Sequence, residues 1–172
     1  MFLLALGVNP PAGAVTDNQW QAVSDVGAGV LIGSALAIPP IRDDWQGFRQ
    51  AGYSIGLAAG LATLGKALVT EERPDQSGND SFPSGHAAVA FASATTMYRR
   101  YGWEYGVPAY ALATLTGAAR VAAHKHHWYD AVAGAGIGVG SGWLFTDPFN
   151  DNVQLVPWAD SKHVDVLVGV SW

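Results

Sequence analysis

The chain has 172 residues and no cysteine, which is typical of one domain that buries its own core and excludes disulfide scaffolds and cysteine-based zinc sites. Hydrophobic residues make up 49% of it and charged residues only 13%, which argues against disorder and against a solvated coiled coil. The formal net charge of -5 argues against a broad nucleic-acid-binding surface. Any anion must therefore be held by a local cluster of cations.

Helix signals begin near residue 17 and continue to about residue 150. Asp17 or Asn18 can cap a first helix, which the proline pair at residues 39 and 40 should end near residue 37. Asp43 or Asp44 can cap a second helix, which should run to about residue 70, ahead of Pro74.

Three further helices are expected after a polar loop at residues 75–82. Ser84 is a natural N-cap for an alanine-rich helix that Gly102 should end. Pro108 should lie in the first turn of the next helix, and a last helix should begin near His127 and end before Pro148.

The tail differs in its pattern. Residues 153–156 and 164–170 alternate apolar with other residues around a turn region, which predicts a two-stranded hairpin. The expected fold class is therefore all-α: a compact bundle of five to six helices with a short C-terminal β-hairpin. We expect three segments, namely an apolar arm or clipped signal at 1–16, a helical catalytic domain at 17–150, and the hairpin tail at 151–172.

Apolar stretches that carry almost no charge recur at residues 26–41, 51–65, 105–119 and 131–146. Each is shorter than the roughly 20 residues that span a bilayer, and each is rich in Gly, Ala, Ser and Thr. The sequence therefore favours a soluble or peripheral bundle, with a membrane-embedded bundle as the alternative, because small residues allow close helix packing in either solvent.

Two cations mark the first candidate site segment. Lys66 and Arg73 are seven positions apart, which would place them on one face of the second helix as a two-cation fork. The alternative is that they interact with the helix dipole and pair with Glu71 or Glu72.

The second segment is Pro83-Ser84-Gly85-His86. A helix N-terminus offers free N–H groups and a positive dipole end, which suit a phosphate oxygen, and Gly85 lets the backbone come close. His86 could donate a proton to a leaving oxygen near neutral pH. An ordinary N-cap is the alternative.

The third segment, residues 120–130, holds Arg120, three histidines and Asp130. Three interpretations remain open. His124 with His127, or His126 with Asp130, has helical spacing for metal ligands. His126 could instead be a nucleophile whose other ring nitrogen Asp130 orients. A histidine-rich surface turn is the third.

Together, Lys66-x6-Arg73-Pro74, Pro83-Ser84-Gly85-His86 and Arg120-x5-His126-x3-Asp130 resemble the three-part motif of the type 2 phosphatidic acid phosphatase family. That family shares its helical fold with bacterial non-specific acid phosphatases and vanadium haloperoxidases. One departure is visible, because Ala119 stands where the third motif usually has a serine that helps to orient the phosphate or the arginine.

The resemblance implies a hydrolase of phosphate monoesters that needs no metal. In it, Lys66, Arg73 and Arg120 would neutralise the phosphoryl oxygens, and Ser84 and the Gly85 amide would complete the cradle. His126 would be the nucleophile, Asp130 the carboxylate that orients it, and His86 the general acid. His124 and His127 would then be structural.

The resemblance leaves the substrate open between a phosphatidic-acid-like lipid and a small soluble ester. Glu71, Glu72, Asp75 and Asp80 form an acidic cluster that should repel polyanions. A vanadate-dependent haloperoxidase, with vanadate as cofactor and not merely as a phosphate mimic, or a lipid pyrophosphate phosphatase is the alternative on the same scaffold. The expected setting is the bacterial cell envelope, in the periplasm or facing it, with association to a membrane surface and no nucleic-acid partner.

Overall fold

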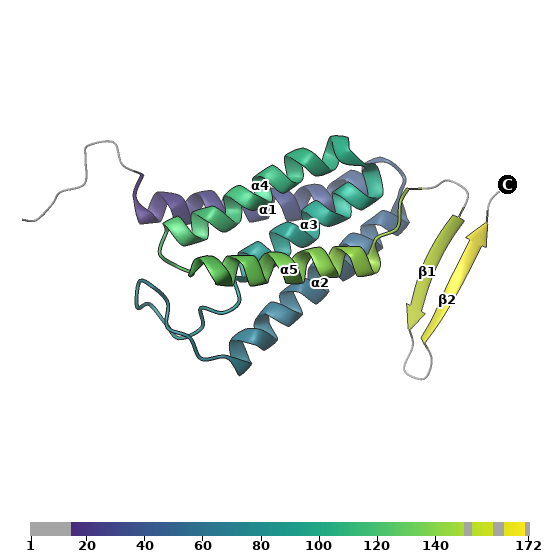
Figure 1. Ribbon diagram of the computed structural model, residues 1–172. Coiled ribbons are helices and arrows are strands. Elements are labelled where there is room, and N and C mark those ends of the chain that lie inside the picture. Colours follow the sequence, from purple (N-terminus) through teal and green to yellow (C-terminus); the bar gives the residue numbers. More distant parts are fainter. Residues whose placement is uncertain (1–14, 150–152, 160–163, 171–172) are drawn as a thin grey trace, which may run out of the picture.

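The computed structural model describes residues 15–149, 153–159 and 164–170. Five long helices lie side by side as a bundle, with successive helices running in roughly opposite directions (Figure 1). The elements in chain order are α1 (Asp17–Ile41), α2 (Trp45–Leu68), α3 (Gly85–Tyr101), α4 (Trp103–Ala122), α5 (Trp128–Phe145), β1 (Val153–Ala159) and β2 (Val164–Val170). The predicted helical fold is confirmed.

Helix α1 differs from its prediction at both ends. Its N-cap is Thr16, not Asp17 or Asn18, and Thr16 forms a capping box with Gln19. The proline pair does not end the helix near residue 37 but lies inside its last turn, before the helix ends at Ile41. The prolines remove two N–H donors, yet their carbonyls still accept hydrogen bonds from the backbone N–H groups of residues 42–44.

Most of the other helix ends follow their capping residues. Asp44 caps α2 by accepting a hydrogen bond from the Gly47 N–H at 2.8 Å, and Ser84 caps α3 as predicted. Gly102 ends α3 at a φ of 84°, a left-handed conformation that glycine adopts without strain. Pro108, however, is not in the first turn of α4, because that helix begins at Trp103, directly after the glycine.

Helix α3 packs against α5 along a stripe of small residues. Gly134, Gly138 and Gly142 of α5 face it at four-residue spacing, and a Cβ built on Gly138 would lie 2.3 Å from the Ala88 carbonyl oxygen. These positions therefore admit only glycine at this separation of the two backbones. Fully buried alanines, such as Ala88 and Ala92, line the facing side of α3.

A buried ion pair joins the start of α2 to the end of α3, at the end of the bundle opposite the α4–α5 turn. The Arg100 guanidinium donates to both carboxylate oxygens of Asp44, at 2.7 and 2.6 Å, and both side chains are almost fully buried. Arg100 also donates to the carbonyls of Asp147 and Pro148, and the Tyr101 hydroxyl donates to Asp44. This network joins α2, α3 and the segment after α5.

Strands β1 and β2 pair antiparallel, from Val153 opposite Val170 to Ala159 opposite Val164. The pairing includes Pro157, which we had expected to lie in the turn between the two strands. The residues that join the two strands, 160–163, lie outside the described residues, as does most of the predicted N-terminal arm, so the complete hairpin and the arm stay predictions.

Candidate active site

The predicted site residues gather at one end of the bundle. There α2 and α4 end, α3 and α5 begin, and the loop of residues 69–83 connects α2 to α3 (Figure 1). The first two sequence segments lie at the two ends of the α2–α3 connection, and the third lies in the α4–α5 connection. The bundle therefore brings them together although they span 65 residues of sequence.

Lys66 and Arg73 do not share a helical face, so that prediction is wrong. Helix α2 ends at Leu68, Val69 is extended, and Glu71 forms a parallel bridge with Asp80. The loop thus doubles back, and Arg73 reaches Asp80 with two hydrogen bonds, at 2.9 and 3.1 Å. This guanidinium holds the pKa of the Asp80 carboxyl below its usual range.

The same loop is also fixed from two other sides. The Lys66 ammonium, in the last turn of α2, donates to the backbone carbonyls of Asp80 and Ser81. Lys125, in the turn between α4 and α5, donates to Asp75 at 2.6 Å, and this bond holds the pKa of the Asp75 carboxyl well below its usual range. Lys66, Arg73 and the α4–α5 turn are therefore joined through one loop.

The start of α3 carries the second segment. The Ser84 N–H donates to the backbone carbonyl of Asp130 at 3.0 Å, which ties the N-terminus of α3 to the first turn of α5. Gly85 has open space around its α-carbon, as a backbone that cradles a phosphate requires. His86 points its Nε2 at a carboxylate of α1, Asp25, at 2.9 Å.

Arg120 reaches the site from the last turn of α4 and is almost fully buried. Its NH1 contacts the Ser24 hydroxyl at 3.4 Å and the Asp25 carboxylate at 3.6 Å, while its Nε has no hydrogen-bond partner among the described residues. Part of this guanidinium is therefore available to a ligand, and a phosphate oxygen suits it.

His126 is the most enclosed titratable ring of the site, with 2% of its surface exposed. Burial, reinforced by the positive charges of Arg120, Lys66 and Arg73, lowers its pKa to about 4. The ring is therefore neutral at pH 7, which is the state that a nucleophilic or metal-binding imidazole needs. Its Nδ1 lies 3.6 Å from Asp130 Oδ2, longer than a hydrogen bond, and has no other partner in the described part of the chain.

Asp130 is completely buried in the first turn of α5. Its Oδ2 accepts a hydrogen bond from the Ser81 hydroxyl at 2.6 Å and another from the His127 N–H at 2.8 Å. These two donors fix the carboxylate beside the His126 ring. Neither donor was identified from the sequence, because neither Ser81 nor His127 is one of the motif residues.

A groove of about 430 Å³ opens from the site between α1, α2 and α3. Its polar end is formed by Asp25, Lys66 and His86. The rest is lined by small and apolar residues, namely Ala28, Gly29, Ile32, Ala59, Ala62, Thr63, Gly85 and Val89. A ligand with a charged head and an apolar body fits this distribution.

A model of the PAP2 superfamily matches residues 47–154, which include every motif residue described above. The chain belongs to the PAP2 superfamily. It is similar to a lipid A 1-phosphatase of Porphyromonas gingivalis, with 32% identity over 129 residues, 68% of this chain and 29% of that protein. It is also similar to a lipid A 4'-phosphatase of Helicobacter pylori, with 36% identity over 57% of this chain and 51% of that protein.

The PAP2 fold is matched in three dimensions as well. The crystal structure of Aquifex aeolicus LpxE superposes with a TM-score of 0.64 and 25% identity, over 74% of this chain and 83% of that one. The chain spans about a third and a half, respectively, of the two curated relatives named above.

The remaining histidines of the third PAP2 motif segment do not have the helical ligand spacing considered from the sequence. His124 lies in the turn after α4 with a φ of 53°, and its exposed ring contacts Asp17 at 3.2 Å. Residues 124–127 thus form a turn and not a helix, so His124 and His127 do not share a helical face.

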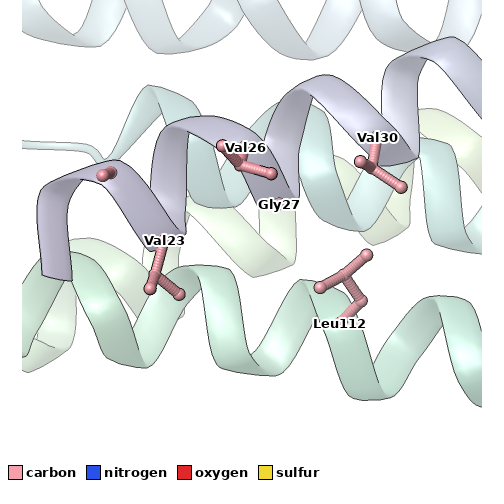
Figure 2. A pocket seen from close by; sticks show the side chains of 6 residues that line it. Val23, Val26, Gly27, Val30 and Leu112 are labelled. Carbon is pink, nitrogen blue, oxygen red and sulfur yellow. The ribbon is translucent and has the colours of Figure 1, made fainter. Parts of the chain in front are cut away.

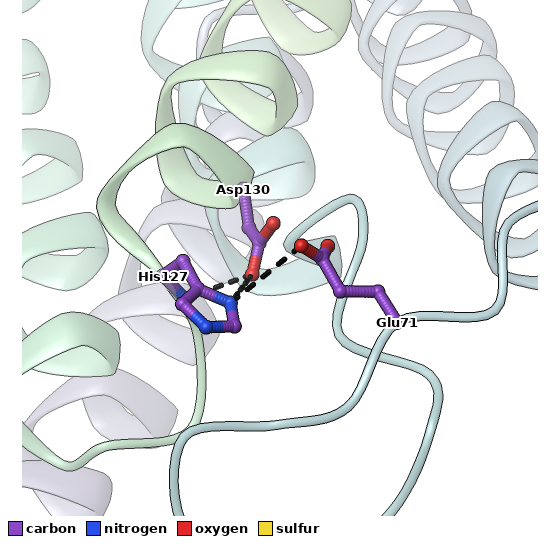
Figure 3. Close-up of side chains that lie close together, drawn as sticks. All are labelled: Glu71, His127 and Asp130. Carbon is purple, nitrogen blue, oxygen red and sulfur yellow. Dashed lines mark hydrogen bonds and ion pairs between the residues drawn. The ribbon is translucent and has the colours of Figure 1, made fainter.

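A different trio of this PAP2 site has the closeness that a metal ion requires. Ligand atoms of Glu71, His127 and Asp130 lie within 4.8 Å of one another, the one such group among the described residues (Figure 3). His127 Nδ1 is 3.4 Å from Asp130 and 3.8 Å from Glu71. The Asp130 oxygen in this trio already accepts two hydrogen bonds, from the Ser81 hydroxyl and from the His127 N–H, which hold it beside the His126 ring.

Proposed function

We propose that the chain is a membrane-embedded phosphatase that hydrolyses a lipid phosphate monoester through a phosphohistidine on His126. The observation that carries the proposal is the environment of that ring, which is buried, neutral at pH 7 and surrounded by three cations and one carboxylate. A neutral imidazole can attack phosphorus, and the cations can stabilise the charge that spreads over the phosphoryl oxygens.

The reaction follows from the positions of these groups. His126 presents Nδ1 to Asp130, so Nε2 attacks phosphorus and forms a P–N bond as the P–O bond to the lipid breaks. His86 gives its proton to the departing oxygen and then takes one from the water that attacks the phosphohistidine. Phosphate and the lipid alcohol leave, and the ring of His126 is restored. Lys66, Arg73 and Arg120 supply the positive charge, so these steps require no metal ion.

The placement of charge along the helices supports a membrane setting. Residues 26–41, 50–65, 87–98, 105–119 and 131–146, the middle of every helix, contain no Asp, Glu, Lys or Arg. The helices have 17 to 25 residues, or about 26 to 38 Å at 1.5 Å per residue, close to the thickness of a bilayer core of about 30 Å. By length and composition, α1 is the one described helix that could cross a membrane on its own.

The side chains follow an arrangement that suits lipid better than water. The core consists mainly of alanine, serine and threonine, whereas many large apolar side chains are exposed, including Ile41, Leu68, Val132 and Leu144. An open apolar hollow of about 390 Å³ between α1 and α4 is lined by small and apolar residues, namely Ala22, Val23, Val26, Gly27, Val30 and Leu112 (Figure 2). A bilayer would cover these surfaces, so they favour the embedded alternative over the soluble one.

Exposed aromatic residues lie near both ends of the bundle, as membrane proteins place them at the two interfaces. Trp128 and Tyr129 are at the site end, and Trp45, Trp103 and Trp143 are near the opposite end. The site would then lie at one membrane surface, where a lipid phosphate group is found. A periplasm-facing orientation is part of the proposal.

The groove beside the site supports a lipid substrate, because its apolar part begins where the phosphate would be bound. Both curated relatives are named as lipid A phosphatases, so a phosphorylated lipid A is the first substrate to test. The proposed class is broader and includes other lipids that carry a phosphate monoester.

The decisive experiment measures phosphate release by the full chain in detergent with EDTA, from lipid A, from phosphatidic acid and from para-nitrophenyl phosphate. We expect metal-independent release from lipid, abolished in His126→Ala and retained in His124→Ala, which removes the exposed ring two residues away. An acid-labile phosphoprotein should accumulate on rapid quenching in wild type and not in His126→Ala. Activity that survives in His126→Ala would refute the mechanism.

A second experiment tests the lipid assignment. Gly29 lines the groove and has open space around it, so Gly29→Leu fills the groove without a backbone collision. This variant should lose activity on lipid substrates and keep it on para-nitrophenyl phosphate. The control is Gly136→Leu, at a position on α5 that is equally open and outside the groove. Equal losses on both substrates would contradict the lipid assignment.

A further inference from the structure

Asp25, on the third turn of α1, is a charged residue of the site that no motif contains. It lies ahead of residues 47–154, the part of the chain that the family model matches. Its Oδ1 is 2.9 Å from His86 Nε2 and 3.6 Å from Arg120 NH1. One carboxylate oxygen therefore contacts the proposed general acid and one of the proposed phosphate-binding cations.

A purely structural role explains this carboxylate poorly. The Asp25 side chain is 48% exposed and lines the groove, whereas the structural ion pair of Asp44 and Arg100 is almost fully buried. A half-exposed ion pair contributes little to stability. Its negative charge also lies in a site that has to receive a phosphate dianion, where it works against binding.

We propose that Asp25 is a positioning residue for His86, an inference that rests on the proposed function. By holding Nε2 of the imidazole, Asp25 leaves Nδ1 as the nitrogen that faces the departing lipid oxygen. A histidine orients in this way when one ring nitrogen is bound to a carboxylate and the other carries the proton that is transferred. The site then contains two histidine–aspartate pairs, one for the nucleophile and one for the acid.

The proton balance of the step gives Asp25 a second effect. As the P–O bond breaks, His86 Nδ1–H passes its proton to the lipid oxygen, and the ring becomes neutral. Water later returns a proton to Nδ1 when its oxygen attacks the phosphohistidine. Asp25 stays ionised throughout and stabilises the charged ring before each transfer.

Three charged groups face His86 from the helices around it. Asp25 comes from α1, Lys66 from α2 and Arg120 from α4. Burial lowers the pKa of the His86 ring, the two cations lower it further, and Asp25 is the one carboxylate among these three groups that raises it. Without the charge of Asp25, the His86 ring would lose its proton at a still lower pH, so a smaller fraction of the enzyme would carry the acid form near neutral pH.

The test compares Asp25→Asn with wild type from pH 5 to pH 9, using lipid phosphate hydrolysis by the full chain in detergent. We expect kcat to fall about 10- to 100-fold at pH 8 and to recover toward wild type near pH 5.5. The basic limb of kcat/KM should move to lower pH by about one unit or more. The control is Asp17→Asn, which also removes an α1 carboxylate that contacts a histidine, away from the site, and its profile should match wild type.

Binding of inorganic phosphate, measured by calorimetry on the same proteins, gives an independent readout. Asp25→Asn should bind phosphate more tightly than wild type, because a negative charge has left the site, whereas Asp17→Asn should not. If the basic limb of kcat/KM does not move in Asp25→Asn, or if activity falls equally at every pH, the inference is wrong. The proposed function still stands in that case, provided that wild type is active. If wild type releases no phosphate from any lipid phosphate, the proposed function fails, and the inference fails with it.

Discussion

Ser81→Ala is expected to weaken both the fold and the chemistry through one hydrogen bond. The Ser81 hydroxyl is fully buried and donates to Asp130 Oδ2 at 2.6 Å. A hydrogen bond to a charged group contributes about 1.5 to 3 kcal/mol net. Because the His127 N–H still donates to the same oxygen, the loss should lie near the lower value, about 1.5 to 2 kcal/mol.

The carboxylate of Asp130 would then be held by the His127 N–H alone and less firmly placed beside His126, whose Nδ1 is 3.6 Å from its Oδ2. If the full loss were expressed in the transition state, kcat/KM would fall by about 10- to 30-fold, since 1.4 kcal/mol corresponds to a factor of ten.

The assay pairs denaturant unfolding in detergent with phosphate release from lipid. The matched control is Ser77→Ala, because the Ser77 hydroxyl makes the same kind of bond, to Asp75 at 2.7 Å, in the same loop but exposed to solvent. That control should change stability by no more than about 0.5 kcal/mol and leave activity unchanged. If the two variants are equal in stability and in activity, Ser81 does not position Asp130 and the reasoning is refuted.

Three more outcomes are expected. Arg100→Met should lower the free energy of unfolding by about 3 to 5 kcal/mol, because it leaves Asp44 buried without its partner, and a smaller loss in denaturant unfolding would contradict a tight pair. Gly138→Val should lower stability by about 1 to 3 kcal/mol, since its Cβ would collide with the α3 backbone, whereas a thermal melt of Gly136→Val should show little change. The pKa of His126, about 4 and so well below 6.5, keeps its ring neutral from pH 7 down to about pH 4, and an NMR titration midpoint near 6.5 would contradict its burial among cations.

The sequence predicted the helices best where a single residue sets a boundary. Ser84 and Gly102 were identified as the start and stop of α3 because their side chain and backbone properties act locally. The α1 prolines led to a wrong helix end for the same reason. A local rule says that they break a helix, but carbonyls near the end of a helix can accept from the following turn instead.

The roles of particular loop residues could not be read from spacing. Seven positions between Lys66 and Arg73 suggest one helical face, yet Glu71 pairs with Asp80 and turns the chain into a loop. That pairing depends on residues nine positions apart in a segment without periodicity. The two cations nevertheless act on the same ring, since both contribute to the low pKa of His126.

Asp25 and Ser81 were missed because they contact the motif residues across the fold. Asp25 is 61 positions from His86 in the sequence, and Ser81 is 49 positions from Asp130. A charged residue inside a largely apolar helix does give a signal, because a charge in contact with other helices is costly without a partner. That signal indicates that a partner exists and does not identify it.

The two buried arginines at opposite ends of the bundle differ in how fully their donors are paired. At the end of Arg100, the guanidinium meets a carboxylate and two backbone carbonyls, as expected of a group that only holds the fold together. At the other end, Arg120 Nε, His126 Nδ1 and Asp130 Oδ1 are buried and lack a hydrogen-bond partner among the described residues.

Such groups cost stability, and proteins retain them mainly where a ligand supplies the missing contacts. Among the described residues, the same bundle thus holds an arginine whose donors are paired at one end and an arginine with an unpaired Nε at the other. A phosphate dianion complements the unsaturated arginine, and the stability lost in keeping its donors unpaired becomes binding energy for the charge that develops during phosphoryl transfer.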